Sequence, residues 1–379
     1  MQFKIGFNRK RKAENCFLIM SDFGRMEKAF FGIIIGLMCV TALVANFLVI
    51  FVVYRNTILR QQFSSVFIVN LAMCDFFIAL LSMPLSLGAL VHYGWPFTTF
   101  LCHFNGFSNQ VLGISAILTL AVISVDRFYA VIKPLKYRAK MTMQKAFNSI
   151  CCIWIQAALF ALVPALYGWY MFNQNYFFCT FSSVSRGKSE MAFTYCLYFF
   201  NFGIPLVIML VAYYKIFQVA KIHSQRIAPA VVALGTFGVQ NVVDIRKEVG
   251  RQREARAARK IIVVIAAFLC CNAPYTTLRL LELFNGCKLE LPIIVTVCAK
   301  LLNFLKSSLD PLIYGLFQRR FRCALSGIFL SKCQRPSRGL SLNQTSSQRT
   351  DVTCNNIATN GSITPIESPN TSFKKFWLY

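Results

Sequence analysis

Seven long runs of apolar residues divide this chain of 379 residues, and they constrain its fold more than any other feature. A helix that crosses the hydrocarbon core of a bilayer, about 30 Å thick, needs roughly 20 mainly apolar residues. Water-soluble domains rarely contain even one uncharged stretch of that length. The sequence therefore predicts a helical membrane protein with seven spans, at about 29–54, 64–91, 99–132, 146–168, 192–220, 256–284 and 291–316.

The composition also favours a bilayer over water as the surrounding medium. Hydrophobic residues make up 56% of the chain and charged residues 14%, with a mean hydropathy of +0.54. Globular domains average about 45–50% apolar and about 25% charged residues. The runs are continuous and lack the alternation of apolar and polar residues that a transmembrane β-barrel needs, so a barrel is excluded.

The net charge of +26 would suit a nucleic-acid partner, but the distribution of the charge argues against one. Basic residues gather in three connections, at 133–145, 246–260 and 319–322. The three loops on the other side hold only Arg186, Lys188 and Lys288. Basic loops of membrane proteins face the cytoplasm, so we expect the N-terminus outside and the C-terminus cytoplasmic. The expected partner is therefore a lipid bilayer.

Strongly polar residues occur inside the apolar runs, where each charge costs on the order of 3 kcal/mol at the centre of a helix. They are Asn46, Asp75, Arg127, Lys306 and Asp310. Prolines also interrupt runs 5, 6 and 7, and each removes a backbone hydrogen bond and bends its helix. These prolines are Pro205, Pro274 and Pro311. One such residue could serve packing alone, but the whole set in this order indicates a functional bundle.

With these residues in this order, the chain resembles the rhodopsin-like G protein-coupled receptors over roughly residues 29–330. The matching motifs, at least one in each run, are Asn46, Asn70 to Asp75, Cys102, Asp126-Arg127-Phe128, Trp154, Pro205 with Tyr213, Cys271 to Tyr275, and Asp310 to Tyr314. The resemblance implies an all-α membrane protein of the plasma membrane, a seven-transmembrane helix bundle with a short amphipathic eighth helix. The expected parts are an extracellular N-terminus (1–28), the bundle (29–316), helix 8 (317–330) and a disordered cytoplasmic tail (331–379).

The resemblance also implies the function. A receptor of this class passes a signal to a heterotrimeric G protein, with arrestin and receptor kinases as further partners. The stretch 214–284 is most similar to a small orphan subgroup thought to raise cyclic AMP through the stimulatory G protein. The alternative is a non-signalling polytopic protein such as a transporter, but no internal repeat is visible. No enzyme activity, cofactor or metal site is expected, and the chain has three histidines.

The resemblance places the G-protein switch at the inner ends of the helices. Arg127 would be held by Asp126, and by Glu254 on run 6, in the inactive state. Tyr213 and Tyr314 belong to the same switch. Glu254 lies twenty residues before Pro274, about 30 Å along a helix, which places it at the cytoplasmic boundary. The alternative is that Glu254 pairs only with arginines on its own helix.

Two of the fifteen cysteines are expected to form a disulfide, chiefly because related receptors have one there. Cys102 begins run 3 on the outer side, and Cys179 lies in the outer loop between runs 4 and 5. A second outer bridge between Cys16 and Cys287 stays open. Cys333 follows the basic stretch 317–330 and is a candidate for lipidation, or else an ordinary free thiol.

The resemblance assigns five residues to a ligand pocket: Asn109, Tyr275, Arg279, Lys300 and Phe304. Asn109 stands where amine receptors keep an Asp, and Phe304 stands where opsins keep their retinal lysine, which argues against both ligands. Two cations favour a carboxylate or phosphate ligand, whether small molecule, lipid or peptide. The alternative is that Glu282 and Glu290 neutralise both cations. Asn272 replaces the Trp that acts as the activation toggle in related receptors, so we expect signalling without agonist.

The last expectation concerns a buried ionic site formed by Asp75, Lys306 and Asp310, with Asn46 nearby. In related receptors Asp75 helps to hold a sodium ion, but Ala116 occupies a ligand position here and cannot coordinate one. A bare ammonium in mid-membrane needs a partner. We expect Lys306 to replace the sodium ion and to bridge Asp75 and Asp310. The alternative is a Lys306 that turns elsewhere in the bundle or is deprotonated.

Overall fold

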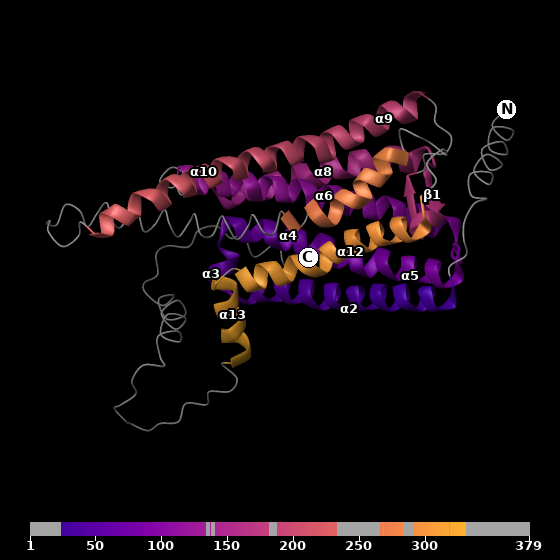
Figure 1. The fold of residues 1–379 in the computed structure, drawn as a ribbon, viewed down its shortest axis with the longest axis horizontal. Coiled ribbons are helices and arrows are strands. Elements are labelled where there is room, and N and C mark those ends of the chain that lie inside the picture. The colour runs from indigo at the N-terminus through magenta and orange to yellow at the C-terminus, as the bar shows by residue number, and fades with distance from the viewer. Residues whose placement is uncertain are drawn as a thin grey trace, which may run out of the picture. The chain divides into compact units, whose positions relative to one another are not determined.

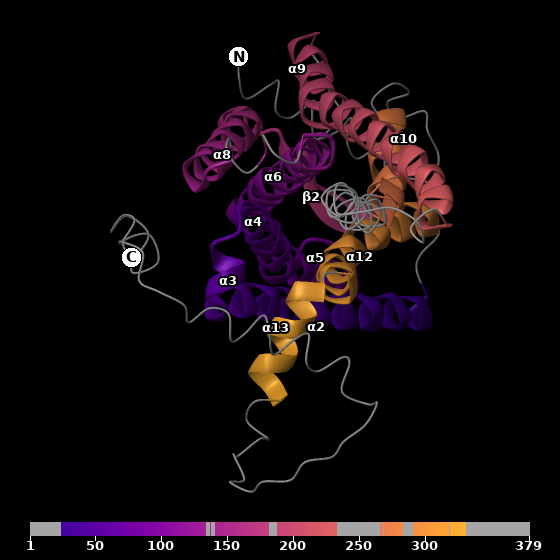
Figure 2. The same cartoon turned by 90° about the vertical axis from the view of Figure 1, so that its left-hand side faces the viewer.

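The computed structural model describes residues 24–133, 137, 141–181, 188–232, 266–267, 269–282, 291–317 and 319–330. Long helices lie side by side as a bundle (Figures 1 and 2). In chain order they are α2 (Arg25–Arg55), α4 (Phe63–Phe77) continued by α5 (Met83–His92), α6 (Thr99–Ile132), α8 (Met143–Leu166), α9 (Lys188–Tyr198) continued by α10 (Ile204–Val232), the helix 269–282, and α12 (Ile293–Phe317). Short α3 (Thr57–Arg60) follows α2, and α13 spans Arg319–Leu330.

Helix α6 is the centre of the bundle. It contacts α4, α8 and α10, while α2 contacts α4, α5 and α12. The polar face of α6 is buried, with Asn105, Ser115, Thr119 and Ser124 fully enclosed. Thr119 and Ser124 donate to backbone carbonyls one turn earlier, so these hydroxyls are satisfied within their own helix.

Two helices contain a π-helical turn directly before a proline. The turn η1 (Ile78–Ser82) precedes Pro84 in α5, and η3 (Phe199–Gly203) precedes Pro205 in α10. Proline offers no N–H, and its ring clashes with the carbonyl four residues earlier, so a wider turn relieves both problems. The irregularity at Pro205 agrees with the expected break in run 5, whereas the one at Pro84 was not expected from the sequence.

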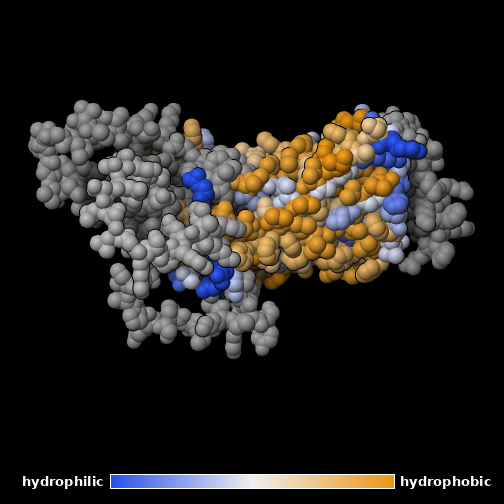
Figure 3. Space-filling view, turned by 90° about the horizontal axis from the view of Figure 1, so that it is seen from below, coloured by the Kyte–Doolittle hydropathy of each residue, from blue (hydrophilic) through white to orange (hydrophobic). Residues whose placement is uncertain are grey.

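The outer surface of the bundle is apolar. Figure 3 shows a hydrophobic band over its middle, with hydrophilic residues at both ends. Large apolar side chains such as Phe30, Ile155 and Val207 are about 60% exposed, which only a lipid environment makes favourable. Within the described residues, five helical segments are long and apolar enough to cross a membrane: 25–55, 63–92, 99–132, 143–166 and 189–219.

A β-hairpin closes one end of the bundle. Strand β1 (Tyr170–Asn173) pairs antiparallel with β2 (Phe178–Phe181), and the 3-10 turn η2 (Gln174–Tyr176) joins them. The hairpin packs on α6 at Gly106, where any Cβ would lie 2.5 Å from the Tyr170 ring. Only glycine allows that approach, so Tyr170 buries its ring and donates from its hydroxyl to Gln110 at 2.9 Å.

Candidate functional site

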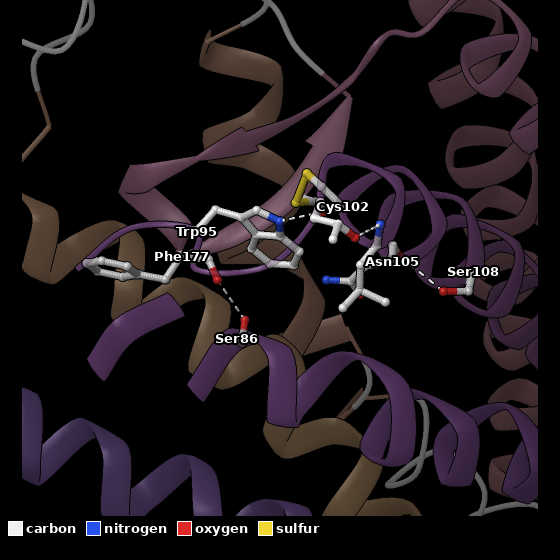
Figure 4. The surroundings of a disulfide bond; sticks show 9 residues. Ser86, Trp95, Cys102, Asn105, Ser108 and Phe177 are labelled. Atoms are coloured by element: carbon white, nitrogen blue, oxygen red, sulfur yellow. Dashed lines mark hydrogen bonds between the residues drawn. A yellow bond between two sulfur atoms is a disulfide. The ribbon is translucent and has the colours of Figure 1, made fainter. Parts of the chain in front are cut away.

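The hairpin is anchored to the bundle by a disulfide and by hydrogen bonds. Cys179 on β2 is bonded to Cys102 near the start of α6, with a Cα–Cα distance of 5.4 Å (Figure 4). This is the pair that the family resemblance implies. On the neighbouring helix α5, the Ser86 hydroxyl donates to the Phe177 carbonyl at 2.9 Å. The inserted loop is therefore held on the α5 and α6 side of the bundle.

The opposite edge of the hairpin contacts the sixth and seventh helices. The Tyr176 hydroxyl donates to Glu282 at 2.7 Å, and the Phe181 carbonyl accepts a hydrogen bond from Arg279. Thr296 on α12 donates to the Asn175 carbonyl at 2.6 Å. Burial, and then the Glu282 carboxylate, raise the pKa of the Tyr176 hydroxyl, so it remains a donor. The hairpin thus joins four helices at one end of the bundle.

The two pocket cations have different surroundings. Arg279 forms an ion pair with Glu282, one turn further along the same helix, and both side chains are buried. Lys300 is 3% exposed, and its Nζ has no hydrogen-bond or ion-pair partner among the described residues. The expected neutralisation by glutamate therefore applies to Arg279 through Glu282, whereas Glu290 lies outside the described residues.

Three aromatic rings surround the Lys300 ammonium instead of a carboxylate. Its Nζ lies 3.7 Å from the centroid of Phe178, 4.5 Å from that of Phe304 and 4.8 Å from that of Tyr275. The negative faces of such rings attract a cation, although less strongly than a carboxylate does. We call this arrangement of Phe178, Tyr275 and Phe304 the aromatic cage.

A cavity of about 180 Å³ lies beneath the hairpin. Its lining includes Asn109, Tyr275 and Arg279, as expected, but not Lys300 or Phe304. The hairpin packs Phe178 against Phe304, and the Lys300 ammonium lies over the Phe178 ring. A role of Lys300 and Phe304 in ligand binding stays a prediction. Among the described residues, the lining includes five side-chain amides and two cations but no carboxylate: Asn109, Gln110, Asn201, Asn272, Asn303, Arg279 and Lys306.

Asn272 and Asn303 connect two helices within this cavity. The Asn303 amide donates to the Asn272 carbonyl oxygen at 2.8 Å, which links α12 to the helix 269–282. Asn272, which stands where related receptors have a tryptophan, is therefore engaged in a polar contact.

Among the described residues, no group of three or more His, Cys, Asp or Glu side chains is placed to hold a metal ion.

Lys306, which lines the cavity, belongs to the buried ionic site. The Lys306 ammonium lies 3.1 Å from Asp75 Oδ1, and the Ser307 hydroxyl donates to the same oxygen at 2.8 Å. Asp75 is completely buried and Lys306 is 5% exposed. Asn46 donates to the Ser307 carbonyl at 2.9 Å, which ties α2 to the same turn of α12.

Asp310 is the second carboxylate of the expected bridge through Lys306. It is 1% exposed, yet its oxygens accept no hydrogen bond from the described residues, and the ion pair of Lys306 goes to Asp75. The contact with Asp75 forms one half of the expected bridge, and the half to Asp310 stays a prediction. Helical side chains point toward the N-terminus of their helix, which favours Asp75 over a residue one turn further along α12.

At the other end of α6, Arg127 Nη2 lies 3.1 Å from Asp126 Oδ2. Asp126 also accepts from Ser64 at 2.9 Å and from the Tyr137 hydroxyl at 2.6 Å. Burial, and then the neighbouring carboxylate, raise the pKa of Tyr137 and keep it a donor. No pattern in the sequence points to Ser64 or Tyr137 as partners of Asp126, from which they lie 62 and 11 residues away.

The other expected switch residues are only partly described. Tyr213 on α10 is 9% exposed, and its hydroxyl has no hydrogen-bond partner among the described residues. Tyr314 lies in α12, but its side chain is not described. Glu254, Cys333, Cys16 and Cys287 lie outside the described residues.

The comparisons with known proteins agree with this geometry. The model of the family "7 transmembrane receptor (rhodopsin family)" matches residues 45–314. G-protein coupled receptor 26 of Homo sapiens is 31% identical over 304 residues, covering 77% of this chain and 87% of that protein. Octopamine receptor beta-2R of Chilo suppressalis is 29% identical, with 80% and 81% covered. The crystal structure of squid rhodopsin superposes with a TM-score of 0.73 at 25% identity, covering 91% of this chain and 94% of that one.

The chain therefore belongs to the rhodopsin family of seven-transmembrane receptors. It is a G protein-coupled receptor in a lipid bilayer, with a heterotrimeric G protein as its partner, and the family is one of receptors rather than enzymes.

Proposed function

We propose that this receptor activates the stimulatory G protein, raises cyclic AMP, and does so without an agonist. The observation that carries the proposal is the Asp126–Arg127 pair at the inner end of α6, with Asp126 held by two further donors. A charge-assisted pair of this kind can be held or released, so two populations of the receptor can exchange. The similarity of 214–284 to an orphan subgroup thought to raise cyclic AMP supports the choice of G protein.

Signalling without agonist is supported by the contact between Asn272 and Asn303. Asn272 stands where related receptors have the bulk of a tryptophan ring, and it accepts a hydrogen bond from Asn303 on the neighbouring helix. Less bulk at this point lowers the barrier to a shift of the helix 269–282 relative to α12. Asn272→Trp is therefore expected to lower the basal signal at equal surface expression.

The remaining parts of the switch follow the family pattern. Glu254 is proposed to approach Arg127 from the inner end of the sixth helix, with Tyr213 and Tyr314 stabilising the released arginine. The basic connections face the cytoplasm, so the N-terminus is outside. The Ser- and Thr-rich stretch 331–379 would then be the substrate of receptor kinases and the site of arrestin binding, with Cys333 as a lipid attachment point.

Expression at graded levels in cultured cells, with cyclic AMP as the readout, tests the proposal. Cyclic AMP should rise with the amount of receptor at the surface, because the active population is intrinsic to the chain. Arg127→Ala should remove that rise at the same surface level. A flat response that Arg127→Ala does not change would rule the proposal out.

A further inference from the structure

We propose that the outer end of the cavity, around Tyr275 and between Arg279 and Lys300, binds the carboxylate of a small ligand. The inference rests on the proposed receptor function only in taking the cavity as the ligand site. Tyr275 and Arg279 line the cavity, and the Lys300 ammonium lies behind the rings of Phe178 and Tyr275 that form part of the same lining.

The charges at this end do not balance. Two buried cations, Arg279 and Lys300, face one buried carboxylate, Glu282, so the described residues carry an excess of one positive charge. An uncompensated buried cation is unfavourable, and an added anion would relieve that cost.

Lys300 is the residue that such an anion would satisfy. The residue is only 3% exposed, and yet its three N–H donors have no hydrogen-bond partner among the described residues. Arg279 already donates to Glu282 and to the Phe181 carbonyl. A rotation of the Phe178 ring would open Lys300 to the cavity, while the disulfide at Cys179 keeps the hairpin in place.

The chemistry of the lining selects the ligand class. An amine would meet two cations and no carboxylate in the described lining, so the cavity disfavours the ligand named in the octopamine receptors. One excess positive charge matches a monoanion. The amides of Asn109 and Gln110 and the hydroxyls of Thr180 and Thr276 offer hydrogen bonds to the remainder of the ligand. A compact aromatic or aliphatic carboxylate fits a cavity of about 180 Å³.

Benzoate and benzamide are matched probes, because they share shape and differ in charge. Thermal unfolding of the full-length purified receptor is measured against increasing concentrations of each at constant ionic strength. Benzoate should raise the unfolding temperature in a saturable manner, and benzamide should raise it much less. Lys300→Met should weaken the response to benzoate about tenfold, because a charge-assisted contact is lost. Lys215→Met, a change at an exposed lysine of α10, should leave the response intact.

Equal shifts with benzoate and benzamide, or a benzoate response unchanged in Lys300→Met, would overturn the proposal. A folding defect in Lys300→Met is distinguished by its unfolding temperature without ligand, and Lys300→Arg then serves as the second variant, since it keeps the charge and should keep the response. The assay contains no G protein. Its failure therefore leaves the proposed coupling standing, and a failure of coupling leaves the binding result standing.

Discussion

Two lysines on α12, six residues apart, are buried to almost the same degree but have opposite surroundings. Lys306 is 5% exposed and has the Asp75 carboxylate at 3.1 Å. Lys300 is 3% exposed and has only aromatic rings around its ammonium among the described residues. The Lys306 ammonium is thus paired with a carboxylate, whereas the Lys300 ammonium remains available to an anion. The comparison separates a lysine that stabilises the bundle from one that we propose recognises a ligand.

The partners explain the difference. Asp75 belongs to α4, so the ion pair joins two transmembrane helices deep in the bundle, and Ser307 and Asn46 extend that connection to α2. The aromatic cage combines Phe178 from the hairpin, Tyr275 from the sixth helix and Phe304 from α12 itself. A cage that includes a loop residue can open by moving that residue, whereas the ion pair cannot open without exposing a buried charge.

The largest effect is expected from Lys306→Met. It leaves Asp75 buried without its cation, and breaking such a pair costs about 3–5 kcal/mol. Surface expression and the unfolding temperature should both fall sharply. Lys306→Met combined with Asp75→Asn should recover part of both, because the stranded charge is removed. Expression of Lys306→Met at the level of the unaltered receptor would contradict the pairing role.

A smaller loss is expected from Glu282→Gln. Arg279 then keeps only the neutral Phe181 carbonyl, and Tyr176 exchanges a charged acceptor for a neutral one. Because glutamine removes the charge but still offers a carbonyl acceptor, the cost should be about 2 kcal/mol, less than for Lys306→Met. Thermal unfolding of the purified variants side by side measures the order. Equal losses would show that both ends of the cavity are equally sensitive to charge.

The matching change at the other lysine, Lys300→Met, should leave the unfolding temperature unchanged or raise it. Removing the ammonium loses cation–π attraction of about 0.5–2 kcal/mol and relieves a desolvation cost of similar or greater size. The comparison with Lys306→Met is internal, since both changes lie on α12 and replace the same residue type. A drop as large as that of Lys306→Met would mean that Lys300 has a carboxylate partner after all.

The smallest effect on the unfolding temperature is expected from a change of the salt cation in the buffer. Exchange of sodium for potassium at constant ionic strength should not change the unfolding temperature, because the Lys306 ammonium already supplies the cation beside Asp75. Lys306→Met should acquire a sodium dependence, since the buried Asp75 carboxylate then lacks its cation. Sodium-dependent stability of the unaltered receptor would show that an ion enters despite the lysine.

The sequence predicted the helices well because bilayer thickness sets their length, and each expected run that the structure describes contains a helix. It also predicted the Lys306–Asp75 contact, because a buried ammonium has few partners to choose from. For Asp310 it offers only a prediction, since the direction of a lysine side chain on its own helix decides which carboxylate it meets. It did not predict the packing of Phe178 on Phe304 and Lys300, because nothing in residues 170–181 reveals that this loop folds into the bundle. Only the expected disulfide at Cys179 tied that loop to α6.

Nucleotide exchange by purified components tests the central claim most directly. The receptor is reconstituted in lipid nanodiscs with purified stimulatory G protein, and the rate of nucleotide exchange is followed without any ligand. The account predicts that the receptor accelerates exchange on the stimulatory G protein more than on an inhibitory one, and that Arg127→Ala removes the acceleration. No acceleration on the stimulatory G protein, or the same rate with Arg127→Ala, would contradict it.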